Sequence, residues 1–362
     1  MRLVKLNGPF NKSREQCASA DPHPQRLRGP FPTVGMLLMQ ALPKPVEFPP
    51  RWDPEWVSRR TSVEVARRER LHTREPASGR LPPAPHRIFA WALKAAGIYR
   101  RGYRNFLDLT LTRLRHFPPL WPRGLDGLRI LQLSDLHLDL DPALVPVICA
   151  RLRDLPFDLA VLTGDFWDVS LAREASAVAG LKTLLSALGR PALGVHAVLG
   201  NHDTLQLAAR LESLGLSLLI NEAVVLGHGE SHFALAGIDD AYAFGTGSVE
   251  AAARACPGSL PRILLSHSPQ VATAARDAGF GLMLSGHTHG GQICLPGGRS
   301  LVTMEKIPAP LFRGSWRAGP LRGYTTTGTG ACHLPIRFNC PPEMVLHSLH
   351  AAPMLTKSSQ NL

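Results

Sequence analysis

Five short apolar segments, each followed by residues that can bind a metal ion, place the strongest constraint on how this chain folds. The segments are 128–133, 159–163, 195–199, 263–265 and 282–284. Helix-like stretches lie near the early segments, at 143–155, 172–188 and 204–214. Strands that alternate with helices are typical of an α/β fold in which parallel strands present their C-terminal ends to one site. The sequence therefore predicts an α/β domain with a site at the strand ends.

The residues that follow these segments are carboxylates, imidazoles and one amide. They are Asp135, His137, Asp165, Asn201, His267, His287 and His289. A single histidine at a strand end is more often a hydrogen-bonded core residue, but five such strand ends in succession favour a metal site. Mixed carboxylate and imidazole ligands suit divalent ions such as Mn, Fe, Zn or Mg. Seven ligands suit two ions, about 3.5–4 Å apart, that share a bridging carboxylate.

Further strands are predicted outside these five segments. The stretches 222–226 and 233–238 have the pattern of a hairpin, and 324–329 and 344–349 are expected to form edge strands. His196 lies within a predicted strand, so we expect it in the core. The histidines that match no motif are expected on the surface or in loops; they are His228, His232, His333, His347 and His350.

Composition divides the chain into four parts. We expect a disordered leader rich in Pro and Arg at 1–85, a basic amphipathic helical segment at 86–120, the α/β domain at 121–352 and a flexible tail at 353–362. Residues 1–120 contain 22 Lys and Arg against 9 Asp and Glu, whereas residues 121–362 contain 18 against 19. Because the α/β domain has no positive excess of its own, we expect no nucleic-acid partner.

Apolar and aromatic residues in the basic segment recur at three- and four-residue steps, which indicates one helical face. They are Phe89, Leu93, Ala96, Tyr99, Tyr103, Phe106, Leu107 and Leu114. Such a helix can lie on an anionic membrane surface; the alternative is that it packs on the protein's own domain. No run approaches the ~18 apolar residues of a membrane span, and no signal peptide is evident. We therefore expect a cytoplasmic protein with peripheral contact at the inner membrane face.

The order of the motifs resembles that of the calcineurin-like metallophosphoesterase superfamily. The motifs are Asp135-Leu-His137, Gly164-Asp165-x-x-Asp168, Gly200-Asn201-His202-Asp203, His267 and Gly286-His-Thr-His-Gly-Gly-Gln292. The last motif and the segment 328–343 are similar to a subgroup of bacterial membrane-associated phosphoesterases related to YkuE and YaeI. The resemblance implies a four-layer α/β/β/α sandwich of two mixed sheets with a dimetal site at the C-terminal ends of the strands.

The resemblance also assigns the ligands to two metal ions, with manganese favoured among Mn, Fe, Zn and Mg. The first ion would be held by Asp135, His137, Asp165 and His289, and the second by Asp165, Asn201, His267 and His287. Asp165 would bridge the ions together with a water or hydroxide that attacks phosphorus. His202 would help the leaving oxygen or stabilise the transition state. Asp168 and Asp203 are the two candidates for holding the His202 ring.

The function implied by the resemblance is hydrolysis of a phosphodiester or pyrophosphate bond. Many protein phosphatases of the superfamily have Arg-Gly after Gly-Asp-x-x-Asp, whereas this chain has Val169-Ser170, which argues against a protein phosphatase. The subgroup includes enzymes that cleave UDP-2,3-diacylglucosamine, so a lipid-linked nucleotide is the favoured substrate. The alternatives are a general phosphodiesterase or phosphatase on soluble substrates, and a catalytically silent metal-binding scaffold. Specificity is expected in the loops at 139–145, 166–172, 239–249 and 295–323.

Overall fold

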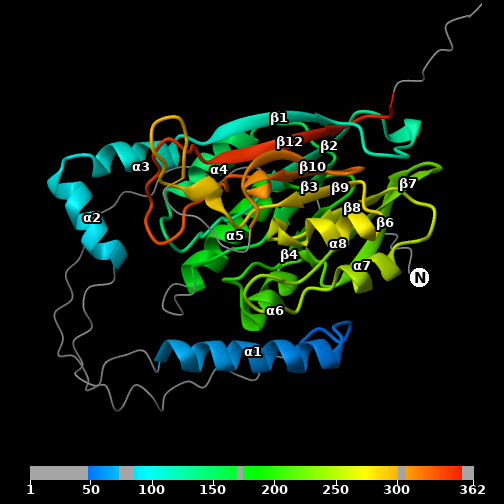
Figure 1. The fold of residues 1–362 in the computed structure, drawn as a ribbon, viewed down its shortest axis with the longest axis horizontal. Helices are drawn as coiled ribbons and strands as arrows, with labels where there is room; N and C mark the ends of the chain where they lie inside the picture. Colours follow the sequence, from blue (N-terminus) through cyan, green and yellow to red (C-terminus); the bar gives the residue numbers. More distant parts are fainter. Residues whose placement is uncertain (1–47, 73–84, 169–173, 301–306, 353–362) are drawn as a thin grey trace, which may run out of the picture. The chain divides into compact units, whose positions relative to one another are not determined.

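The computed structural model describes residues 48–72, 85–168, 174–300 and 307–352. Within these ranges the chain forms two six-stranded sheets that pack face to face, with helices against their outer faces (Figure 1). This arrangement confirms the predicted α/β sandwich of four layers. Three apolar cores separate the layers: one lies between the sheets, and one lies between each sheet and its helices.

The first sheet carries the strands of the first three apolar segments. Its order is β1 (Thr110–His116), β12 (Glu343–Leu349), β2 (Leu128–Leu133), β3 (Leu159–Thr163), β4 (Val195–Val198) and β5 (Ser217–Leu218). Strands β2 to β5 are parallel, and β12 runs antiparallel to β2. Because parallel neighbours end at the same edge of a sheet, the loops after β2, β3 and β4 meet there.

The second sheet brings the remaining two apolar segments to the same region. Its order is β10 (Gly314–Ala318), β11 (Leu321–Thr325), β9 (Leu282–Ser285), β8 (Arg262–Leu265), β7 (Ser231–Gly237) and β6 (Glu222–His228). Strands β11, β9, β8 and β7 are parallel, and β6 pairs antiparallel with β7 as the predicted hairpin. Both sheets are therefore mixed.

Two groups of helices cover the sheets. Leucines and alanines of α4 (Leu144–Leu152), α5 (Glu174–Leu188) and α6 (Leu205–Ser213) pack on the first sheet. Apolar residues of α7 (Val249–Ala255) and α8 (Ala272–Asp277) pack on the second. None of the helices among the described residues combines the length and apolar character that a membrane span requires.

The two strands predicted at sheet edges lie inside the sheets instead. β12 is enclosed by β1 and β2, and β11 by β10 and β9, because β1 and β10 occupy the edges. His347 was therefore predicted wrongly as a surface residue. It is fully buried on β12, where its ring lies 2.9 Å from His116 Nε2 and 2.9 Å from Gln132 Oε1. His196 is buried, as expected.

The N-terminal part of the chain also differs from the prediction. Residues 54–72, placed in the disordered leader, form α1 (Pro54–His72). Residues 1–47 and 73–84 of that leader lie outside the described residues, as does the whole tail at 353–362. The basic segment is two helices and a strand, namely α2 (Pro85–Ala95), α3 (Tyr99–Leu107) and β1. A left-handed Gly97, with φ 72°, follows α2 and separates it from α3. The α/β domain consequently begins before residue 121.

Helix α1 docks on the domain through a buried arginine. The Arg60 guanidinium is completely buried and lies 2.8 Å from Asp239 Oδ1. It also donates to the Asp203 carbonyl at 2.6 Å and lies over the Phe244 ring at 3.4 Å from the centroid. The Trp56 indole donates to Asp239 at 3.1 Å. The buried contacts of Arg60 and Trp56 with Asp239 thus fix the position of α1 on the domain. Composition alone does not reveal such contacts.

We predict that Arg60→Met destabilises the fold by about 3–5 kcal/mol, because it leaves the Asp239 carboxylate buried without its cation. Urea denaturation of the full chain measures the loss. Arg59→Met removes the same side chain type from an exposed position of α1 and should change stability by less than about 0.5 kcal/mol. Equal unfolding midpoints for the two variants would contradict a structural role of the buried pair.

Candidate metal centre

The seven residues predicted as metal ligands come together where the two sheets meet. Single donor atoms of four of them lie within 4.8 Å of one another; these residues are Asp135, His137, Asp165 and His289. Asp165, His267 and His287 form a second group under the same limit. The Asn201 amide oxygen lies 3.0 Å from His267 Nε2 and so joins the second group. Asp165 belongs to both groups, which is the arrangement that a bridging carboxylate requires.

The backbone at five of these residues has a left-handed conformation that non-glycine residues seldom adopt. The φ angles are 52° at Asp135, 41° at His137, 57° at Asp165, 73° at His287 and 50° at His289. Each such residue carries a strain on the order of 1–3 kcal/mol and persists only where the surroundings enforce it. These left-handed conformations turn the chain sharply after each strand, so that the side chains point toward a common site. Strained residues gathered in this way are typical of a functional site.

Two glycines let the ends of β3 and β4 approach each other closely. A Cβ on Gly164 would lie 2.7 Å from the Gly200 nitrogen and 2.7 Å from His267 Nδ1. A Cβ on Gly200 would lie 2.5 Å from the Asp165 nitrogen. Because any side chain would separate these loops, glycine is required at both positions.

The two aspartates considered as supports for His202 have different surroundings. Asp168 Oδ1 lies 3.3 Å from His202 Nδ1, although the pair is not aligned as a hydrogen bond. Asp203 is completely buried and directs both carboxylate oxygens at backbone N–H groups, those of Asp165, Phe166 and Gly200, at 2.8–2.9 Å. Asp203 therefore organises the loops, and Asp168 is the carboxylate beside the His202 ring.

Burial dominates the electrostatics of the site. It raises the pKa of Asp135 to about 6, and it lowers the pKa of His137 to about 4 and that of His287 to about 3. Burial also opposes a charged His267, but the Asp165 carboxylate raises the pKa of that ring to about 10. Crowded buried carboxylates thus attract positive charge, and several imidazoles remain neutral with a lone pair to offer.

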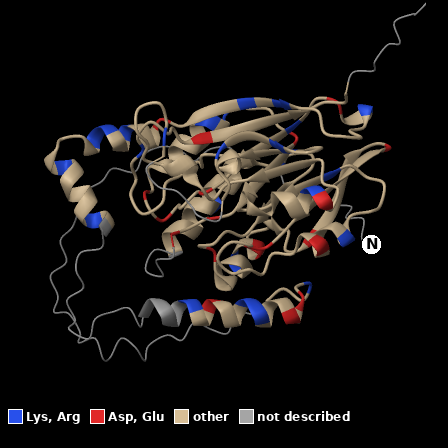
Figure 2. Ribbon diagram, in the orientation of Figure 1, with Lys and Arg blue, Asp and Glu red and all other residues tan. Residues whose placement is uncertain are grey.

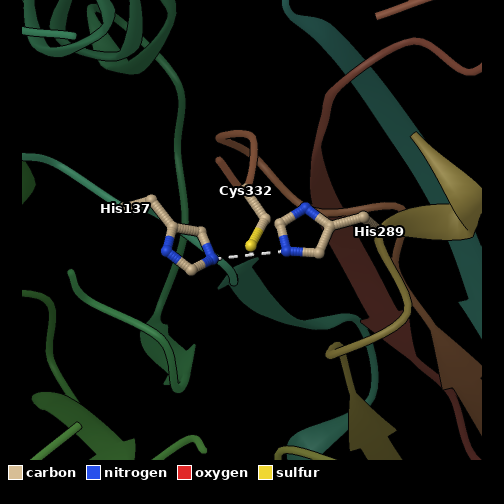
Figure 3. A group of neighbouring side chains, drawn as sticks. All are labelled: His137, His289 and Cys332. Atoms are coloured by element: carbon tan, nitrogen blue, oxygen red, sulfur yellow. Dashed lines mark hydrogen bonds between the residues drawn. The ribbon is translucent and has the colours of Figure 1, made fainter. Parts of the chain in front are cut away.

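Two residues of the segment 328–343, Arg337 and Cys332, lie close to the ligand residues, although no sequence motif indicates a role for either. The buried Arg337 guanidinium donates to the Gly330 carbonyl at 2.6 Å and the Thr327 carbonyl at 2.8 Å, and lies 3.5 Å from His289 Nδ1. The Cys332 thiol falls within 4.8 Å of donor atoms of His137 and His289 (Figure 3). Only the resemblance of the whole segment to a subgroup pointed toward this loop.

A cavity of about 630 Å³ opens onto the metal-ligand groups. Its polar lining includes Asp165, Asn201, His202, His287 and His289. Its apolar lining includes Phe89, Ile293, Phe312 and Leu334. Tyr242 and Phe312 come from two of the loops expected to set specificity; residues 169–172 and 301–306 of those loops lie outside the described part of the chain.

Comparisons with known proteins agree with this geometry. The family model of the calcineurin-like phosphoesterases matches residues 128–291. The chain is 31% identical to the uncharacterized metallophosphoesterase YkuE of Bacillus subtilis over 275 residues, which cover 72% of this chain and 93% of YkuE. It is 32% identical to the phosphodiesterase YaeI of Escherichia coli over 267 residues, or 68% of this chain and 92% of YaeI.

The chain belongs to the calcineurin-like phosphoesterases. This phosphoesterase is also 30% identical to the UDP-2,3-diacylglucosamine pyrophosphatase LpxG of Chlamydia muridarum, over 57% of its own chain and 77% of LpxG. The family resemblance predicted from the motifs is thereby confirmed. The protein is a metal-dependent phosphoesterase, and members of this family typically bind two metal ions.

The donor atoms of the phosphoesterase fit such ions. His137 Nδ1 donates to the Trp167 carbonyl at 3.1 Å and His267 Nδ1 to the Thr163 carbonyl at 2.7 Å, so each ring directs its Nε2 toward the ligand groups. The Nε2 of the neutral His137 ring has a lone pair for a cation, and at His267 a metal ion would take the place of the Nε2 proton that Asp165 stabilises. His287 Nε2 is buried and has no hydrogen-bond partner among the described residues. Because one ring nitrogen of His287 lies within 4.8 Å of donor atoms of Asp165 and His267, a metal ion is a suitable partner for this ring.

Proposed function

We propose that this phosphoesterase hydrolyses a phosphodiester or pyrophosphate bond in a lipid-linked nucleotide, with UDP-2,3-diacylglucosamine as the favoured substrate. The observation that carries the proposal is the cavity, in which the metal-ligand groups form the floor and apolar side chains form the wall. A polar floor suits a phosphoryl group, and an apolar wall suits acyl chains. The printed name of the related LpxG, a UDP-2,3-diacylglucosamine pyrophosphatase, supports the same substrate class.

The proposed ligand sets follow the two groups of donor atoms. Asp135, His137, Asp165 and His289 would hold the first ion, and Asp165, Asn201, His267 and His287 the second. When bound, the ions would neutralise phosphoryl charge and make a coordinated water acidic enough to act near neutral pH. Asp165 is buried between the groups, where its two oxygens can serve both.

In this proposal His202 delivers a proton to the leaving oxygen. Its ring lines the cavity and meets the His137 ring edge-on, at 5.1 Å between centroids. Burial opposes an ionised Asp168, but a hydrogen bond from His333 and the charges of nearby imidazoles lower its pKa to about 2. An ionised Asp168 beside His202 Nδ1 would orient the ring toward the leaving oxygen.

We also propose that helices α2 and α3 contact an anionic membrane surface. Three large apolar side chains of α2 are exposed: Ile88 by 53%, Phe89 by 41% and Trp91 by 71%. Lys and Arg are frequent along both helices (Figure 2). Phe89 also lines the cavity, so a membrane-bound α2 would place the cavity wall beside the acyl chains of a lipid.

Metal analysis of the purified protein should find about two divalent ions per chain. We expect Asp165→Asn to lose metal and to abolish turnover of bis-p-nitrophenyl phosphate, because both ligand sets share this carboxylate. Asp277→Asn alters an aspartate on the exposed end of α8 and should retain metal and activity. A wild-type protein that binds two ions yet hydrolyses neither diesters nor pyrophosphates would instead be a silent scaffold.

A Mn²⁺-supplemented screen of UDP-2,3-diacylglucosamine, bis-p-nitrophenyl phosphate and p-nitrophenyl phosphate tests the substrate class. We expect the lipid-linked pyrophosphate to be preferred, and preference for the monoester would overturn the proposal. Phe312→Ala should raise KM for the acylated substrate at least about tenfold more than KM for the small diester, since a buried aromatic contact is worth ~1.5–3 kcal/mol. Val225→Ala, on the exposed face of β6, is the control.

Vesicle co-sedimentation tests the membrane proposal. The full chain should pellet with anionic liposomes at low salt and be released as salt rises. Ile88→Ser combined with Trp91→Ser should weaken binding at least about tenfold, whereas Val65→Ser on α1 should not. Substitutions are preferred to truncation at residue 121, which would remove β1, a strand paired with β12. Equal pelleting of all variants, or no pelleting of wild type, would end the proposal.

A further inference from the structure

We propose that Cys332 is a thiolate ligand of the first metal position, beside His137 and His289. The inference rests on the proposed metal site and deepens it, since it names the class of ion that this position selects. Cys332 Sγ and one nitrogen of each histidine all lie within 4.8 Å of one another. Figure 3 shows the sulfur directed at the gap between the two rings, whose Nε2 atoms lie 3.3 Å apart.

The loop that carries Cys332 is anchored on both sides of the metal-ligand group. The Cys332 backbone donates to Gln292 Oε1 at 2.8 Å and accepts from Gln292 Nε2 at 3.0 Å, so it is tied to the turn that follows His289. Gly330 N donates to the Asp135 carbonyl at 3.0 Å. A Cβ on Gly330 would lie 2.3 Å from the Leu136 carbonyl oxygen, so the two chain segments are in direct contact. The thiol is therefore held in place beside the ligands rather than placed there by a free loop.

Cys332 has a weak alternative partner. Its sulfur lies 3.7 Å from Asp168 Oδ1, a distance suited to an S–H donor. Ligation would replace that contact: the S–H bond breaks, a sulfur–metal bond forms, and the proton passes to water in the cavity, which Cys332 lines. No oxidant or other reactant is needed.

A thiolate would make the two metal positions chemically different. Sulfur ligands favour Zn²⁺ or Fe²⁺ over Mn²⁺ and Mg²⁺. The second group, as described, consists of Asp165, Asn201, His267 and His287, which offer oxygen and nitrogen alone. We infer that the first position takes a thiophilic ion, whereas manganese remains acceptable at the second.

Cobalt titration of the full chain tests the inference without relying on activity. Co²⁺ bound by imidazole and carboxylate groups absorbs in the visible range, and a thiolate adds a charge-transfer band in the near ultraviolet. We expect wild type to show both features. Cys332→Ser should lose the near-ultraviolet band and keep the visible one. Cys340→Ser is the matched control, because that buried thiol contacts the His289 carbonyl oxygen and should leave both features intact.

Competition between Zn²⁺ and Mn²⁺ gives a second readout. Cys332→Ser should lower Zn²⁺ affinity at least about tenfold with little change for Mn²⁺, and Cys332→Asp should shift the preference toward Mn²⁺. Visible bands without a near-ultraviolet band in wild type would show that the thiol serves Asp168 and does not bind metal. An absence of visible bands would overturn the proposed metal centre itself, so the two failures are distinct. If Cys332→Ser does not fold, the wild-type and Cys340→Ser spectra still decide the question.

Discussion

The buried carboxylate of Asp203 is the interaction on which the site depends. Three backbone N–H groups, from the loops after β3 and β4, donate to its two oxygens. The backbone carbonyl of the same residue accepts a hydrogen bond from Arg60 of α1. The loops that carry Asp165, Asn201 and His202 are thereby fixed to each other and to a helix far away in the sequence. Removing this carboxylate would leave three buried N–H groups unsatisfied, each at a cost of about 1–3 kcal/mol.

The same construction explains how the protein tolerates its strained backbone. Left-handed residues at Asp135, Asp165 and His287 are each held between neighbours: His287 N donates to Asp135 Oδ1 at 2.9 Å, and the Asp165 N–H is bound by Asp203. The backbone of the site is thus fixed by its own hydrogen bonds, and the strain is balanced by packing in the three apolar cores.

The cavity has polar side chains at the metal-ligand groups and apolar side chains elsewhere. Asp165, Asn201 and several imidazoles line the polar part of the cavity, while Phe89, Ile293 and Phe312 form an apolar wall. Phe89 belongs to α2, outside the residues that match the family model. The seven predicted ligand residues lie within the residues that match the family model, whereas Phe89, Ile293 and Phe312 of the cavity wall lie outside that match.

Local sequence determined the alternation of strands and helices and the spacing of the ligand residues, since apolar runs and the turns after them depend on near neighbours. It also carried the family resemblance. Sequence patterns did not reveal α1, whose buried Arg60 has its partner 179 residues away, nor the interior positions of β11 and β12. They did not place Cys332 beside His137, because 195 residues separate the two and no local pattern records that distance. Such juxtapositions arise only when long-range strand pairing brings remote loops together, so the tertiary structure alone decides them.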